Sequence, residues 1–308
     1  MRRREESPAT NQVLLFGEVL MDGYGYQRAV GGAPFNVARH LQAFGLRPLL
    51  ISRVGDDWVG DELMAALEAA GLDFEGVQID PDYPTGSVRE RTREDWRIFG
   101  SPPDQAYDFI DPEDARQATA GNAPRLIYFG TLAQRGVVSR SALQTILDSV
   151  DAPRFVDLNL QVPWLAPWIF EAVLEAADIL KLNQDELDVL AWLLQIPGRH
   201  RHERAQSLMA KFSIKKLLLT EGADGACLLN ADGTQAAVTA PPLADAINTV
   251  GVGDAFAAVF ILGLLRGWPD PLMLKRADEF ARAVCRIREA VPMEDRFYER
   301  FLQEWGLV

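Results

Sequence analysis

The chain is organised around a glycine-rich turn that runs directly into an apolar segment, Asn248-Thr249-Val250-Gly251-Val252-Gly253-Asp254 followed by Ala255-Phe256-Ala257-Ala258-Val259-Phe260-Ile261-Leu262. This pattern predicts a tight turn that opens a buried helix. The first turn of a helix has unpaired N–H groups at the positive end of its dipole, and glycines let an anion approach them closely. A carboxylate beside such a cradle repels a resting phosphate. Asp254 fits better as a base that takes a proton from a nucleophile attacking the phosphate.

The same stretch also has an ordinary structural interpretation. An aspartate in a first helical turn complements the helix dipole, and glycines precede many helices. The pattern G-x-G-x-x-G is not completed, because Phe256 occupies the position of the last glycine. Taken alone, the stretch favours the structural interpretation, and the rest of the chain has to decide.

Composition and charge exclude several classes of function. The 308 residues, 48% hydrophobic and 24% charged, suffice for one large α/β domain or two smaller ones. A net charge of −13 argues against nucleic-acid and anionic-membrane partners, although a local pocket can still hold a nucleotide. Cys227 and Cys285 are the only cysteines and suit buried thiols in a reducing compartment. No signal peptide and no membrane span are recognisable, so we expect a cytoplasmic protein.

Strands and helices alternate along most of the chain, which predicts a mostly parallel sheet covered by helices on both faces. The expected strands are 13–17, 49–54, 125–130, 154–158, 178–182 and 215–220, with a hairpin over 225–239. The expected helices are 34–44, 57–70, 139–149, 165–177, 184–194, 203–212, 252–266, 271–288 and 294–304. Residues 18–32 and 76–110 interrupt the alternation with short strands. We expect them to form a small β lid on a single domain over 1–308.

Polar clusters follow several of the expected strands. They are Asp22, Asp157-Leu158-Asn159, Asn183-Gln184-Asp185-Glu186 and Thr220-Glu221-Gly222. One such cluster is explained by a helix cap. Several of them at the carboxyl ends of parallel strands, together with the glycine turn, predict a cleft along one edge of the sheet.

Two motifs in this order resemble the signatures of the ribokinase-like sugar kinases of the PfkB family. Gly31-Gly32-Ala33-Pro34-Phe35-Asn36-Val37-Ala38 resembles the N-terminal signature, and Asn248 to Asp254 resembles the C-terminal signature D-T-x-G-A-G-D. Asn183-x-x-Glu186 and Thr220-x-Gly222 resemble motifs that lie between them, so the likeness covers nearly the whole chain. Gly130-Thr131-Leu132-Ala133-Gln134-Arg135 and Ala106-Tyr107-Asp108 look most like the bacterial fructokinases.

The resemblance implies a three-layer α/β/α fold and transfer of the γ-phosphoryl group of ATP to a sugar hydroxyl. Asp254 would be the general base, and the N–H groups of Gly251, Val252 and Gly253 would stabilise charge on the phosphoryl group. The residues implied for sugar binding are Asp22, Gly32 and Asn36.

The resemblance also implies a nucleotide side. Asn183, Thr220 and Gly222 would bind ATP there. Glu186, with Asn183, would order Mg²⁺ through water, because Mg²⁺ keeps most of its waters in proteins. The lid would close over the sugar, and its strands are a candidate contact between two copies of the chain.

Several residues depart from the family pattern. Asn248 replaces the acidic residue that in family members helps bind a monovalent cation, which puts activation by K⁺ in doubt. Val252 replaces a small alanine, Gln161 stands where many fructokinases have arginine, and Glu289 brings a negative charge to the adenine side. These departures motivate an alternative, a weakly active or inactive relative that binds a sugar or nucleotide as a sensor.

A nicotinamide-dependent oxidoreductase fits poorly, because Gly17-Glu18-Val19-Leu20 after the first strand is not a dinucleotide fingerprint.

Fructose or a related ketose is the expected substrate. The choice of sugar depends on lid and loop geometry that the residue pattern does not contain.

Overall fold

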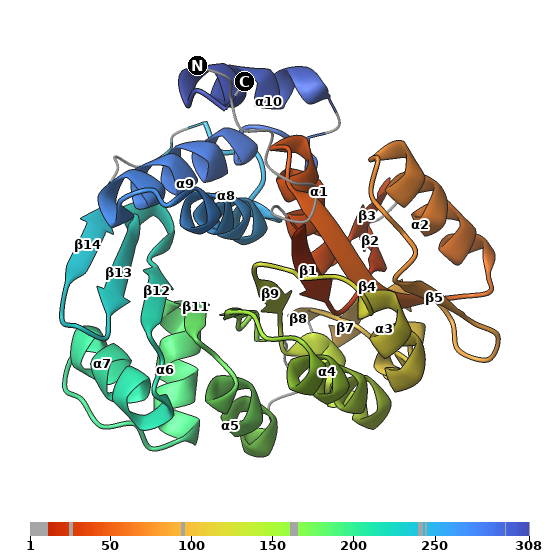
Figure 1. The fold of residues 1–308 in the computed structure, drawn as a ribbon, viewed down its shortest axis with the longest axis horizontal. Helices are drawn as coiled ribbons and strands as arrows, with labels where there is room; N and C mark the ends of the chain where they lie inside the picture. Colours follow the sequence, from red (N-terminus) through yellow and green to blue (C-terminus); the bar gives the residue numbers. More distant parts are fainter. Residues whose placement is uncertain are drawn as a thin grey trace.

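The computed structural model describes residues 12–24, 27–93, 96–160, 166–239, 243, 245–292 and 294–307. Within them, three layers are built around a nine-stranded sheet in the order β14-β13-β12-β11-β10-β9-β1-β4-β5 (Figure 1). The strands are β1 (Gln12–Phe16), β4 (Arg47–Gly55), β5 (Val77–Asp80), β9 (Ile127–Phe129), β10 (Arg154–Asp157), β11 (Ile179–Asn183), β12 (Lys216–Thr220), β13 (Ala226–Asn230) and β14 (Gln235–Val238). All neighbours pair in parallel except that β13 is antiparallel to both β12 and β14. The mostly parallel sheet is confirmed.

Helices cover both faces of this sheet. One face carries α1 (Ala33–Ala43), α2 (Trp58–Ala69), α8 (Val252–Arg266), α9 (Asp270–Val284) and α10 (Asp295–Glu304). The other carries α3 (Pro112–Thr119), α4 (Val137–Ser149), α5 (Pro167–Glu175), α6 (Gln184–Leu193) and α7 (Arg201–Phe212). α8 packs against α1 and α9 and contributes to the hydrophobic core, so it is buried from Ala255 to Gly263. Burial on several sides explains why its sequence is apolar all round.

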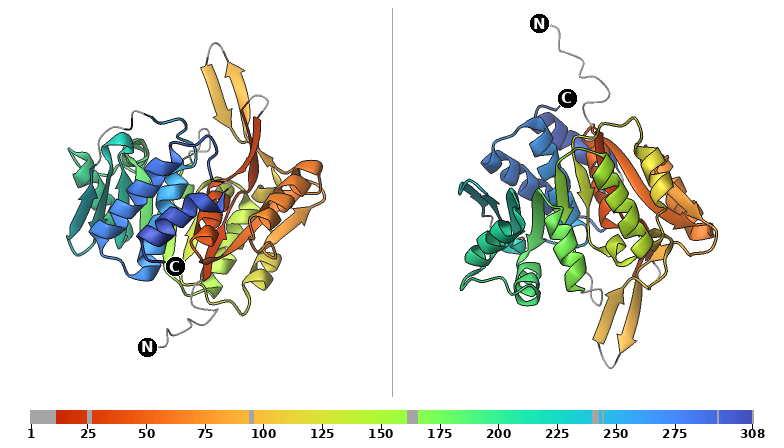
Figure 2. Two further views of the ribbon diagram at one scale, coloured as in Figure 1. Left: turned by 90° about the horizontal axis from the view of Figure 1, so that it is seen from above. Right: turned by 60° about the horizontal axis from the view of Figure 1, so that its bottom comes forward.

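Short strands stand off this body. β2 (Leu20–Tyr24) and β3 (Gln27–Gly31) form a small sheet with β6 (Gly86–Ser87), and β7 (Arg89–Arg93) pairs with β8 (Trp96–Gly100) in a hairpin that projects from the molecule (Figure 2). β5 instead pairs with β4 at the edge of the main sheet, so Val77–Asp80 does not belong to the insertion expected over 76–110. Whether these short strands close as a lid or join two copies of the chain stays a prediction.

The base of the projecting hairpin is tied to the body by a buried arginine. The Arg135 guanidinium contacts the Asp108 carboxylate at 2.7 Å and donates to the carbonyl oxygens of Ser101 and Pro102. Tyr107 also accepts from Arg135 and hydrogen-bonds to Ser101. A paired, hydrogen-bonded charge is the form in which arginine is tolerated in a protein interior. The cluster therefore fixes where the chain leaves the hairpin beside the pocket.

Two expectations for the helices need correction. α9 ends at Val284 and not at 288, because residues 285–290 leave the helix and pack against 247–251. α3 was overlooked, although Asp111 caps it and Pro112 opens it, a recognisable start signal. None of the helices in the described ranges is both long enough and apolar enough to cross a bilayer.

Candidate active site

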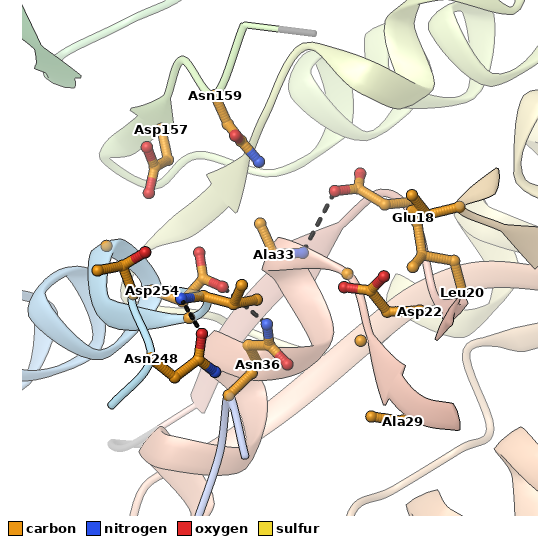
Figure 3. A pocket seen from close by; sticks show the side chains of 18 of the residues that line it. Glu18, Leu20, Asp22, Ala29, Ala33, Asn36, Asp157, Asn159, Asn248 and Asp254 are labelled. Atoms are coloured by element: carbon orange, nitrogen blue, oxygen red, sulfur yellow. Dashed lines mark hydrogen bonds between the residues drawn. The ribbon is translucent and has the colours of Figure 1, made fainter. Parts of the chain in front are cut away.

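A pocket of about 800 Å³ lies where the carboxyl ends of the central strands meet the small β2–β3–β6 sheet (Figure 3). Its wall combines β2, β3, the start of α1, the ends of β10 and β11, the turn before α8 and the segment 288–290. The predicted cleft is therefore present. Of the predicted site residues, those that line the pocket are Asp22, Gly32, Asn36, Asn183, Glu186, Thr220, Gly251, Gly253 and Asp254.

The first turn of α8 is open toward this pocket. Gly251 is the N-cap with φ of 78°, and no side chain caps the helix. A Cβ at Gly251 would lie 2.4 Å from the carbonyl oxygen of Ala290, so glycine is required there for both its backbone angle and its space. The Val252 side chain packs against the hydrophobic core and is not part of the pocket wall. The N–H groups of this turn therefore remain available to a ligand.

Asp254 lies in this first turn and is held by a residue from the other end of the chain. Asn36 Nδ2, on the first turns of α1, donates to Asp254 Oδ2 at 2.7 Å. Burial, and then the neighbouring Asp157 carboxylate, raise the pKa of Asp254 to about 6. Asn36 Oδ1 is buried and has no hydrogen-bond partner within the described part of the chain. An unsatisfied buried acceptor beside a carboxylate is a place where a ligand hydroxyl can bind.

Sequence reasoning missed Glu18, which follows β1 and lines the pocket. Its side chain is buried, and Oε1 accepts from the N–H of Ala33 at 3.3 Å, so it serves the first turn of α1, whose N-cap Gly32 has no side chain (Figure 3). Burial raises the pKa of Glu18 to about 7. Gly32 has φ of 106°, and a Cβ there would lie 2.4 Å from the Glu18 carbonyl oxygen. A single carboxyl group after a buried strand was the available signal.

Sequence reasoning also missed a buried ion pair in the pocket wall. Lys181 Nζ donates to both carboxylate oxygens of Asp157 at 2.8 Å, and Tyr128 donates to the same carboxylate at 3.3 Å. Burial disfavours the charged form of Lys181, but Asp157 outweighs it and the pKa is raised. Nζ lies 3.4 Å from the place of a Cβ on Gly253, beside the open turn. The signal was a lysine inside the apolar strand β11, which requires a partner.

Asn183 and Glu186 form a capping box at the start of α6. Asn183 Oδ1 accepts from the N–H of Glu186 at 2.9 Å, and Glu186 Oε2 accepts from the N–H of Asn183 at 2.7 Å. Glu186 Oε1 accepts from the N–H of Leu160 at 2.8 Å. The pKa of Glu186 is raised, because the effect of burial exceeds the lowering effect of the hydrogen bonds from the Asn183 and Leu160 N–H groups. Both oxygens are thus engaged, and no group of three metal-ligating side chains occurs in the described ranges. Each Glu186 oxygen accepts one backbone hydrogen bond and keeps a second lone pair for a water or a ligand.

Of the two residues predicted for the nucleotide side after β12, one lines the pocket and the other does not. Thr220 reaches the pocket wall, whereas Gly222, in a short turn after β12, does not. Arg288, Glu289 and Ala290 also line the pocket. Gln161 lies outside the described residues.

The model of the family described as "pfkB family carbohydrate kinase" matches residues 8–295. The chain belongs to this family. It is an ATP-dependent carbohydrate kinase, and its mostly parallel sheet flanked by helices is the fold of the family.

Relatives of this carbohydrate kinase are distant but span most of its length. It is 26% identical to a 5-dehydro-2-deoxygluconokinase from Geobacillus thermodenitrificans, over 90% of this chain and 85% of the relative. It is also 26% identical to probable fructokinase-2 from Arabidopsis thaliana, over 90% and 88%. The structure resembles the fructokinase from Xylella fastidiosa with bound ATP, at a TM-score of 0.77 and 18% identity, over 96% and 99% of the two chains.

Proposed function

We propose that the chain transfers the γ-phosphoryl group of ATP to a hydroxyl of fructose or a related ketose, with Asp254 as the general base. The observation that carries this proposal is the pairing of Asp254 with Asn36 at the uncapped first turn of α8. The relatives named fructokinase support the choice of sugar.

The proton step follows from the Asp254 environment. Asn36 Nδ2 occupies Oδ2 of Asp254, which leaves Oδ1 for the reacting hydroxyl. A pKa of about 6 keeps most of the carboxyl ionised at neutral pH and makes it a stronger base than an ordinary aspartate. The unpartnered Asn36 Oδ1 would accept a hydrogen bond from a second sugar hydroxyl. Asp22 and Gly32 border the same end of the pocket and would complete the sugar site.

The phosphoryl group would lie over the open turn of α8. The N–H groups of Gly251, Val252 and Gly253 are aimed where charge develops in a loose transition state, and such preorganised donors are strong stabilisers. The Lys181 ammonium beside Gly253 adds a positive charge that Asp157 holds in place.

The residues present fit a Mg²⁺ ion that is held mainly by water and by the phosphates of ATP. Glu186 and Asn183 would orient its waters, and Thr220 and Gly222 would lie on the nucleotide side. When bound, Mg²⁺ neutralises charge on the transferring phosphoryl group.

ADP release from ATP and Mg²⁺ across a panel of sugars tests the proposal. Asp254→Asn should lower kcat on the best sugar by about 10²- to 10⁴-fold, because the amide cannot accept the proton. Asp111→Asn is the matched control, since Asp111 also lies at a helix start but outside the pocket. Unchanged turnover by Asp254→Asn would contradict the assigned base.

The alternative function, a sensor that binds without turnover, is favoured by one observation, the presence of Glu289 in the pocket wall, where a negative charge would oppose an anionic nucleotide. Thermal shifts with each sugar and with ATP separate the two functions. Stabilisation by a sugar with no ADP release from any sugar would select the sensor.

A further inference from the structure

The side-chain amide of Asn248 holds the glycine turn against a neighbouring segment. Asn248 Nδ2 donates to the carbonyl oxygen of Arg288 at 2.8 Å. Asn248 Oδ1 accepts from the N–H of Val250 at 3.0 Å (Figure 3). These two backbone partners settle which way the amide faces, because a carbonyl accepts only from the NH₂ group and an N–H donates only to the oxygen. The amide therefore orders the turn and links it to the segment that follows α9.

Further bonds join the same two segments. The N–H groups of Ile247 and Asn248 donate to the carbonyl oxygen of Cys285 at 2.8 and 3.2 Å. Arg286 Nε contacts Asp245 Oδ2 at 2.8 Å. The segments 245–251 and 285–290 are thus closed on one another by the chain's own hydrogen bonds.

A monovalent cation is the group that the family likeness implies at this place. A fructokinase from Vibrio cholerae with a similar fold, at a TM-score of 0.77 and 22% identity, is described with bound potassium. Such an ion requires oxygen ligands, and an acidic side chain in place of Asn248 would supply charge as well. Here the NH₂ group of Asn248 covers the Arg288 carbonyl oxygen, Oδ1 is engaged by Val250, and the side chain has no charge. These donors and acceptors do not fit a cation.

We propose that the Asn248 amide takes the place of a monovalent cation in this chain. It joins the turn of α8 to the segment 285–290 by hydrogen bonds, so the pocket is complete without K⁺. The part of this inference that concerns turnover rests on the proposed function, whereas the part that concerns the closure of the two segments does not.

Thermal melting tests the closure without reference to activity. The melting temperature Tm is compared in KCl and in choline chloride at equal ionic strength, so that general screening cancels. Wild type should show the same Tm in both salts. Asn248→Asp loses the donor and places a carboxylate against the Arg288 carbonyl oxygen, so its Tm should fall in choline chloride and recover as KCl is added. Asn248→Ala is the control, with a lower Tm in both salts and no recovery.

Turnover gives the second readout. Wild-type ADP release should agree within about twofold between the two salts, whereas KCl should raise the rate of Asn248→Asp by about fivefold or more. A K⁺-specific rise in wild-type Tm or rate would overturn the proposal. An Asn248→Asp protein that melts like wild type in choline chloride, or that never recovers in KCl, would overturn it as well. If no sugar is phosphorylated, the proposed function fails while the melting comparison still decides this inference.

Discussion

The first turns of α6 and α8 both border the pocket, and each has an acidic residue three positions after its N-cap. They differ in how their backbone N–H groups are satisfied. At α6 the N-cap is Asn183, and Glu186 and the cap exchange hydrogen bonds. At α8 the N-cap is Gly251, which has no side chain to exchange, and Asp254 turns to Asn36 of α1. A helix start that satisfies itself is structural, and one left open can bind an anion. The residue at the N-cap makes the difference.

The largest effect on this contrast should come from Gly251→Ala. The new Cβ would collide with the Ala290 carbonyl oxygen, and an alanine with φ near 78° costs about 1–3 kcal/mol. Displacing the N–H groups of the turn should lower kcat by about 10²-fold, the loss expected for one donor of an anion hole. Steady-state kinetics and urea unfolding measure the two effects.

Gly267→Ala is the matched control, because Gly267 ends the same helix at φ of 67° with no atom within 4 Å of a Cβ. It should destabilise by about 1 kcal/mol and leave kcat unchanged. Equal losses of kcat in the two variants would show that the turn acts only through the stability of α8.

The pH dependence of kcat/KM should show a smaller effect with a defined sign. The protonated Asp254 cannot accept a proton, so kcat/KM should fall about tenfold per pH unit below pH 6. Because the pKa of Asp254 is raised on folding, protonation of this group favours the folded state as the pH falls from 6 toward 4 and does not itself cause unfolding. A rate profile measured beside Tm checks both statements. A flat profile down to pH 5 would exclude Asp254 as the base.

Glu186→Gln should have the smallest effect. Glutamine keeps one oxygen but turns an NH₂ group toward a backbone N–H, so the stability loss should be about 1 kcal/mol, as for a weakened cap. If Glu186 orders the waters of Mg²⁺, the half-saturating Mg²⁺ concentration should also rise by a few-fold. Asp111→Ala, which opens the cap of α3 outside the pocket, is the control: it should lower stability by a similar amount and leave the Mg²⁺ dependence unchanged. A fall in kcat as large as that of Asp254→Asn would place Glu186 in the chemistry and not in the cap.

Much of the fold followed from local patterns. The alternation of apolar strands with amphipathic helices predicted the parallel sheet, because strands buried on both faces have uniformly apolar sequences, as β1 does from Val13 to Phe16. The boundaries were less secure where packing overrides periodicity. Residues 285–288 continue the sequence pattern of α9 but leave the helix. The carbonyl oxygen of Cys285 instead accepts hydrogen bonds from the N–H groups of Ile247 and Asn248.

The residues of the site also fall into a predictable group and an unpredictable one. The glycines and Asp254 were predictable because a positive φ and an uncapped turn impose residue types that are visible in the chain. Glu18 and Lys181 were not, because a lone carboxyl or ammonium group has many ordinary explanations. The role of such a group becomes clear only when its partner is known. The partner of Lys181 is Asp157 on the neighbouring strand β10.

Local residue choice thus accounts for the strands, the helices, the open start of α8 and the family to which the chain belongs. The arrangement of charges around Asp254 has another origin. The hydrogen bond from Asn36 crosses 218 positions of the chain, and the Asn248 amide meets Arg288 across 40. Such contacts depend on the order of strands in the sheet and on how α1, α8 and the segment 285–290 pack. Electrostatic and hydrogen-bond energies change steeply with distance, so the pKa of Asp254 and the closure of its turn exist only in the folded molecule.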